Sequence, residues 1–173
     1  MAELHIIGQI VSGEGFKESN LCCCWSLKYG GGWRLLEGAT TGQTQTDKPA
    51  VGKCCNFAHP VDVHLTTKSI QGWPKVHFEV WHLDDFDRYS IVGYGFTHVP
   101  PVPGEHDVKC TIWRVVGSFR EELVTRFLGG GQQLSDIDLV SNSLDRFKLT
   151  TEAVGFINIQ LYIITRNFDA YGI

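Results

Sequence analysis

The sequence lacks the long apolar segments and the terminal signals that mark membrane-spanning or secreted proteins. It contains no run of about 18 apolar residues, the length needed to cross a bilayer. The first residues, Met1 to Val11, have no basic start, no extended apolar centre and no small-residue cleavage site, all of which a secretory signal requires. We therefore expect a cytoplasmic protein without a membrane span.

Positive charge is also scarce. The 173 residues include 15 Lys and Arg against 19 Asp and Glu, a net charge of -4, and no local cluster of basic residues compensates. Proteins that bind nucleic acid usually present a concentrated basic surface. The sequence predicts no nucleic-acid partner, and it argues against a broad electrostatic contact with a membrane.

Cysteines are present, but not in the spacing that a metal site or a disulfide framework needs. The six fall at Cys22 to Cys24, Cys54 to Cys55 and Cys110, with no C-x-x-C pair among them. Adjacent cysteines on strands behave as small hydrophobic side chains. We interpret all six as reduced structural thiols, with a metal or redox role as the alternative.

Catalytic motifs are missing as well. The sequence has no G-x-S-x-G elbow, no phosphate-binding G-x-x-x-x-G-K-[ST] and no H-E-x-x-H. Its seven histidines are scattered, and a histidine on a strand is more often structural than a ligand or a general base. We expect no enzyme activity, no catalytic residue and no cofactor.

The composition fits one soluble domain spanning residues 1–173. The apolar fraction is 43% and the charged fraction 20%, and this length allows one substantial core. Short alternating or β-branched runs predict strands at 4–11, 21–28, 61–67, 75–81, 90–99, 107–116 and 156–164, with a weaker one at 144–151. About eight short strands imply an all-β fold, an antiparallel sandwich.

One short helix is predicted, at 118–128. Phe119, Leu123 and Phe127 recur at helical spacing, and Ser118 with Glu121 forms a capping box at the start. Gly129 follows the last turn, as is common at a helix end. The segment 33–57 is polar and is predicted to be a long loop or an edge hairpin, and Pro60 is placed at the start of the strand that follows it.

The most informative stretch is Gly72 to Pro100, two strands joined by an acidic turn. In the first strand Val76, Phe78 and Val80 are expected to point into the core. Two glycines, Gly93 and Gly95, interrupt the second strand, which predicts a bulge or a close approach of another backbone. In the last strand, Ile157, Ile159, Leu161 and Ile163 are expected to be core.

The acidic turn carries the most specific metal candidate in the sequence. Asp84, Asp85 and Asp87 could offer oxygen ligands to calcium, and the turn resembles the third loop of membrane-binding C-two (C2) domains. His82, however, stands where that loop has its first carboxylate. The alternative is that the three aspartates solvate the turn and accept hydrogen bonds from its backbone. Phe86, between them, is a candidate tip for insertion among lipid headgroups if it is exposed.

Taken together, several segments resemble the B-nine (B9) domain proteins of the ciliary transition zone. These segments occur in the family's order and spacing along nearly the whole chain: His5 to Ile10, Gly42 to Gln45, His59 to Asp62, Gly72 to Pro74, Gly93 to Phe96, His98 to Pro100, Gly129 to Gly131 and Arg166 to Gly172. The resemblance implies a divergent C2-like β-sandwich.

The resemblance also implies a function. It points to a non-enzymatic scaffold subunit of the tectonic-like (Meckel syndrome) complex at the transition zone and basal body, required for cilium assembly and for the barrier that gates ciliary membrane proteins. Its partners would be other B9 domain proteins and further transition-zone proteins. A peripheral membrane module acting through loop tips, with or without calcium, is the second hypothesis, and an enzyme is the third.

The end of the chain offers a candidate contact for such partners. Arg166, Phe168 and Tyr171 follow the last core strand, and aromatic residues with arginine are enriched at protein interfaces. The alternative is a C-terminal segment that folds back on its own sandwich, because aromatic residues near a terminus commonly complete a core.

Overall fold

Strands dominate the part of the chain that the structure, a computed structural model, describes: residues 1–50, 52–116 and 150–169. Nine strands occur in these ranges, and no helix does. They are β1 Ala2–Glu14, β2 Leu21–Lys28, β3 Trp33–Gly38, β4 Thr41–Gln43, β5 Cys55–Thr67, β6 Lys75–Leu83, β7 Tyr89–His98, β8 Gly104–Val115 and β9 Thr151–Arg166. The predicted helix at 118–128 and most of the predicted strand at 144–151 lie outside the described residues.

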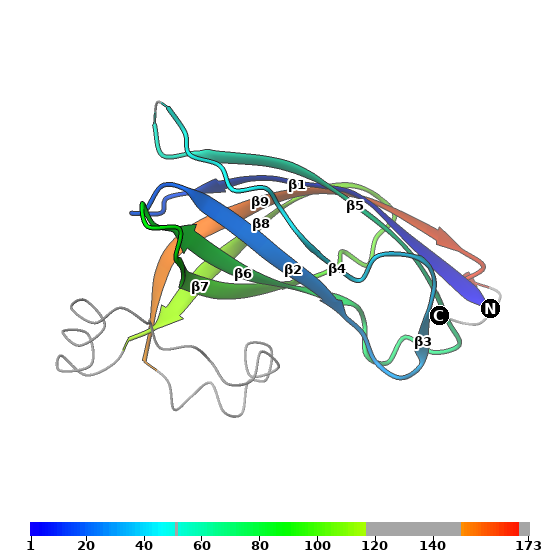
Figure 1. The fold of residues 1–173 in the computed structure, drawn as a ribbon. Helices are drawn as coiled ribbons and strands as arrows, with labels where there is room; N and C mark the ends of the chain where they lie inside the picture. The colour runs from blue at the N-terminus through cyan, green and yellow to red at the C-terminus, as the bar shows by residue number, and fades with distance from the viewer. Residues whose placement is uncertain (51, 117–149, 170–173) are drawn as a thin grey trace.

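All nine strands belong to one antiparallel sheet that curls over itself. The strand order is β3-β5-β1-β9-β8-β7-β6-β2-β4. In Figure 1, β1, β5 and β9 belong to an upper layer, called the first layer below, and β2, β6 and β7 form a second layer beneath them. One hydrophobic cluster takes members from both layers, including Ile6 of β1, Phe78 of β6 and Ile157 of β9. The predicted antiparallel sandwich is therefore confirmed, as two layers of a single curled sheet.

The two layers join where β7 meets β8, and here the backbones come unusually close. Among the described residues, β7 and β8 share one backbone pair, Tyr94 with Trp113. A Cβ atom on Gly93 would lie 2.8 Å from the Trp113 carbonyl oxygen, and one on Gly95 would lie 2.8 Å from that of Thr111. Glycine in a strand often marks such a corner or close approach.

The prediction of a close backbone approach at these glycines is confirmed. The pairing of β6 with β7 also shifts register between Val80 and Trp81, opposite Gly93 and Ile91, so a bulge adjoins the corner. The corner and the bulge together turn the sheet from one layer into the other.

The residues that the alternation places in the core are buried, and on β6 the opposite face is partly buried too, since His77 is only 2% exposed. Val76, Phe78 and Val80 are buried on β6. On β9 the four predicted core residues are between 0% and 4% exposed, and burial of each such side chain stabilises the fold by about 1.5–3 kcal/mol. These four are Ile157, Ile159, Leu161 and Ile163. The opposite faces of β1, β5 and β9 remain directed outward.

The interpretation of residues 33–57 as a loop or an edge hairpin is wrong. Strand β3 pairs with β5 at one edge of the sheet, whereas β4 pairs with β2 at the other edge. The segment therefore passes from one layer to the other, and β3 and β4 do not pair as a hairpin. The segment is polar because β3 and β4 are edge strands, and each has one side without a neighbouring strand.

Two strand boundaries also differ from the prediction. Strand β1 runs on through a bulge between Ile10 and Ser12 to Glu14, where a turn was expected. Strand β5 begins at Cys55, so Pro60 lies inside it. Because β3 pairs with β5 only from Val63 onward, β5 is an edge strand at Pro60, which is where a sheet tolerates the missing amide.

The corner makes a testable prediction about stability. We expect Gly95→Ala to lower the free energy of unfolding by about 1–3 kcal/mol, because the new methyl group would press on the β8 backbone and on Ile112. Urea denaturation measures the change. Gly31→Ala is the matched control, since a Cβ there meets nothing within 4 Å. An equal loss in both variants would contradict the account of the corner.

Candidate interaction surfaces

The turn between β6 and β7 is organised by one carboxylate. Asp84 Oδ1 accepts hydrogen bonds from the backbone amides of Phe86 and Arg88, at 2.8 and 2.9 Å. Asp84 Oδ2 accepts from the Arg88 guanidinium, with both N–O distances 2.8 Å. These bonds, the one from the Arg88 amide foremost, hold the pKa of Asp84 below its ordinary value. Both oxygens of Asp84 are thus occupied within the turn.

The other two aspartates of the turn have different surroundings. Asp85 is almost fully exposed and faces the Lys48 ammonium at 3.6 Å. Asp87 has a φ of 59°, the left-handed conformation that aspartate tolerates in turns. The three carboxylates are not among the described groups whose ligand atoms lie within 4.8 Å of one another. The calcium site at Asp84, Asp85 and Asp87 stays a prediction, and the observed hydrogen bonds match its alternative.

Phe86 projects from this turn into solvent. Its side chain is 80% exposed, and its only aromatic or cation–π contact among the described residues is the Arg88 guanidinium, 5.4 Å from the ring centre. In Figure 1 the turn lies at the end of the molecule opposite the N-terminus. An exposed aromatic side chain at a loop tip is available for contact with a lipid surface or another protein.

The three predicted C-terminal contact residues differ in their surroundings. Arg166 is exposed, with its guanidinium 3.7 Å from the Glu3 carboxylate. Phe168 is half buried and packs edge-on against Trp73, which in turn packs against Trp33. Tyr171 lies outside the described residues. Phe168 therefore extends the core at the open end of the sandwich, while Arg166 faces solvent, and the role of all three in binding stays a prediction.

The outer face of β1 and β9 carries an apolar patch. Ile7, Tyr162 and Ile164 are 41%, 43% and 52% exposed, and Ile7 lies directly opposite Tyr162 in the sheet. The Tyr162 hydroxyl donates to Glu105 on β8 at 3.0 Å, and that carboxylate raises the pKa of Tyr162. We call Ile7, Tyr162 and Ile164 the β9 patch. The alternation that places Ile157, Ile159, Leu161 and Ile163 in the core leaves Tyr162 and Ile164 on the opposite face of β9, but nothing in the sequence indicates that they form a surface.

A comparison with protein families identifies the family of the chain that carries these surfaces. The family described as "Ciliary basal body-associated, B9 protein" matches residues 4–164. The chain belongs to the B9 family. B9 domain-containing protein 2 from Danio rerio is 49% identical over the whole chain and 99% of the relative, and the Homo sapiens protein is 47% identical with the same coverage.

A more distant relative is a longer protein than this chain. The Homo sapiens "Tectonic-like complex member MKS1" is 29% identical over 95% of this chain, which spans 33% of that relative. Among solved structures, the C2A domain of plant Extended Synaptotagmin 1 has a TM-score of 0.52 and 9% identity, covering 94% of this chain and 93% of that one. This likeness shows the fold alone, and it agrees with the C2-like sandwich expected of a B9 domain.

Four of the six cysteines of this B9 domain are buried, namely Cys22, Cys23, Cys55 and Cys110, and Cys24 and Cys54 are half buried. All six are described, and they carry no disulfide. Burial raises the pKa of Cys110 to about 12 and that of Cys24 to about 11. A thiol with so high a pKa carries almost no thiolate near neutral pH, so it is a poor nucleophile and a poor metal ligand unless a metal displaces its proton. In the described ranges there is also no helix that could cross a membrane.

The acidic turn gives a prediction with a defined pH dependence. A carboxyl with a lowered pKa stabilises the turn at neutral pH, and this contribution is lost as the pH falls through the folded-state pKa. We expect Asp84→Ala to reduce the hydrogen-exchange protection factors of the Phe86 and Arg88 amides several-fold at neutral pH, and acid to do the same in the unmodified chain.

Asp85→Ala is the control for this turn, because Asp85 has only an exposed ion pair. Protection factors are compared by NMR after correction for the intrinsic exchange rate at each pH. If Asp85→Ala loosens the turn as much as Asp84→Ala does, the Asp84 carboxylate does not organise it.

Proposed function

We propose that this chain is a non-catalytic scaffold subunit of the tectonic-like (Meckel syndrome) complex at the ciliary transition zone. There it would bind other B9 domain proteins and support cilium assembly and the barrier that gates ciliary membrane proteins. One observation carries the proposal: a single B9 domain relates the chain both to B9 domain-containing protein 2 and to MKS1, a protein named as a member of that complex. Localisation at the base of the cilium is part of the proposal.

The β9 patch is the surface we assign to a B9 partner. Exposed apolar side chains on neighbouring strands form a continuous area, and Tyr162 adds an aromatic ring with a polar end, a side chain favoured in binding hot spots. Arg166 on one side and Glu105 on the other supply the charged rim that protein interfaces commonly have. The patch lies on β9 and β1, which are interior strands of the sheet, so its geometry is fixed before binding.

The assignment predicts the effect of a charge in the patch. We expect Ile164→Lys to weaken binding to a second B9 domain protein at least about tenfold, since a buried lysine without a partner is costly at an interface. Surface plasmon resonance with the partner immobilised gives the affinity. Ile70→Lys is the matched control, because Ile70 is 53% exposed, close to the 52% of Ile164, and lies in the loop between β5 and β6.

The control separates a specific effect from a general one. Both lysine variants add one positive charge to an exposed position, so nonspecific attraction or repulsion changes both alike. Equal affinities for Ile164→Lys and Ile70→Lys would remove the β9 patch from the proposed interface while leaving the family-based proposal to be tested with other surfaces.

A second candidate function, contact with a membrane surface, is favoured by Phe86. Its 80% exposed ring at the end of the turn has the form of a side chain that inserts among headgroups. Because Asp84 is occupied by Arg88, we propose that such binding does not need calcium. The β9 patch lies on β1 and β9, and Phe86 lies in the turn between β6 and β7, so the two functions use different residues and can coexist.

Liposome sedimentation tests this second function. With vesicles of phosphatidylcholine and phosphatidylserine, we expect the chain to sediment equally with calcium and with chelator, and Phe86→Ala to lower the bound fraction several-fold. Val102→Ala is the control, since Val102 is also an exposed apolar loop residue, 60% exposed. No sedimentation, or equal loss in both variants, would rule out insertion of Phe86.

A further inference from the structure

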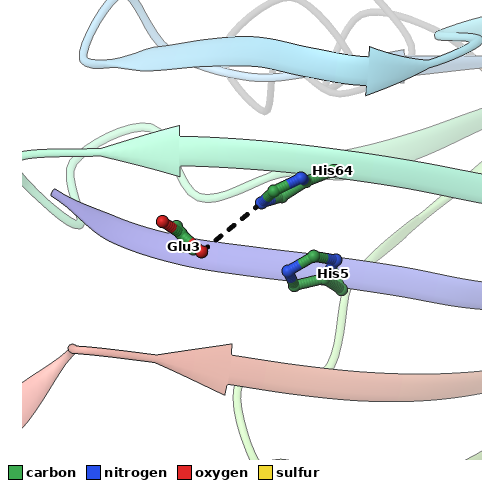
Figure 2. Close-up of side chains that lie close together, drawn as sticks. All are labelled: Glu3, His5 and His64. Carbon is green, nitrogen blue, oxygen red and sulfur yellow. Dashed lines mark ion pairs between the residues drawn. The ribbon is translucent and has the colours of Figure 1, made fainter.

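Three side chains that bind metals in other proteins meet on the outer face of the first layer. Glu3 and His5 are two residues apart on β1 and so point to the same side of the sheet. His64 on β5 lies directly opposite His5 in the register of the two strands. Figure 2 shows Glu3, His5 and His64 gathered between β1 and β5, with a dashed line joining Glu3 to His64.

The ligand atoms of these residues lie close together but are not joined by hydrogen bonds. One such atom from each side chain lies within 4.8 Å of the other two. His64 Nε2 is 3.7 Å from Glu3 Oε2, beyond hydrogen-bond distance, and the two imidazole rings stack with their centres 3.7 Å apart.

His64 Nε2 faces the Glu3 carboxylate, with which it forms an ion pair only when its ring is protonated. It is shielded from solvent and has no hydrogen-bond partner among the residues that the structure describes. A shielded polar atom without a partner costs free energy, and it often marks a bound ion or water. In the tautomer that carries its proton on Nδ1, the lone pair of this nitrogen faces the Glu3 carboxylate and is available to a cation.

The separation of the two atoms suits a metal of zinc size. Nitrogen and oxygen ligands each lie roughly 2.0–2.2 Å from zinc, so two ligands of a tetrahedral ion are about 3.4 Å apart. The observed 3.7 Å between His64 Nε2 and Glu3 Oε2 is close to this value. His5 is half buried and would turn about its side-chain torsions to bring a ring nitrogen to the ion, which breaks the ring stacking.

We propose that Glu3, His5 and His64 form a binding site for a divalent transition metal ion, with zinc as the reference ion. Two imidazoles and one carboxylate are a ligand set that zinc uses with a fourth position open to water. This inference is independent of the proposed scaffold function, because the site lies within one chain. It joins β1 to β5, so a bound ion stabilises the first layer.

Arg166 is the natural competitor of the ion. Its guanidinium lies 3.7 Å from Glu3 Oε2, the same oxygen that faces His64. The Arg166 side chain is 71% exposed, so it can move into water at little cost when the ion binds. Removal of this positive charge should therefore raise the affinity for the metal.

The test is titration of the full-length, tag-free chain with zinc by isothermal calorimetry. We expect one ion per chain, at least about tenfold weaker binding in Glu3→Gln and in His64→Gln, and tighter binding in Arg166→Gln. His98→Gln is the matched control, since His98 is an exposed strand histidine outside the cluster. Circular dichroism of each variant checks that it is folded.

Cobalt spectroscopy separates this site from the cysteines. Bound Co²⁺ with nitrogen and oxygen ligands gives no thiolate charge-transfer band in the near ultraviolet, whereas binding at Cys22 to Cys24 or Cys54 to Cys55 does. The proposal is overturned by the thiolate band, by the absence of zinc binding, or by a zinc affinity that is the same in Glu3→Gln, Arg166→Gln and the unmodified chain. A matching loss in His98→Gln would overturn it too.

Discussion

The close approach of β7 to β8 is the constraint on which the rest of the structure depends. Gly93 and Gly95 place no side chain between the two backbones, so β7 can turn away from the first layer while it still meets β8 at Tyr94 and Trp113. Without this corner the nine strands would continue as an open sheet. With it, the apolar faces of both layers enclose one core, and that burial supplies most of the stability.

Because the core is closed, the outer faces of the strands and the turns are the parts of the molecule available for binding. Strands β1 and β9 lie in the middle of the first layer, so their outer faces are rigid and carry the β9 patch and, beside it, the residues Glu3, His5 and His64. The turn with Phe86 extends from the opposite end of the molecule from the N-terminus. The β9 patch and the candidate metal site thus adjoin on the outer face of the first layer, and the candidate lipid tip lies apart from both, in the turn between β6 and β7.

Local patterns in the sequence predicted those features that local chemistry controls. The alternation in β2, β6 and β9, the acidic turn and the special position of Gly93 and Gly95 all follow from neighbouring residues. Pairing between distant segments was not predictable. The separation of β3 from β4 to opposite edges depends on strand order, and the meeting of His5 with His64 depends on register, for which the 58 intervening residues give no signal. Family resemblance supplied the proposed function, but neither the local patterns nor the resemblance identified the β9 patch, the surface to which we assign partner binding.

The mass of a co-purified particle tests the central claim, that this chain is a scaffold subunit, most directly. The chain would be co-expressed with other B9 domain proteins of the same organism and analysed by size exclusion with light scattering. The account predicts one discrete particle with one copy of each protein, stable when the salt concentration is raised, because apolar contacts at the β9 patch are not screened. A chain that stays monomeric in the presence of these B9 domain proteins would contradict the account.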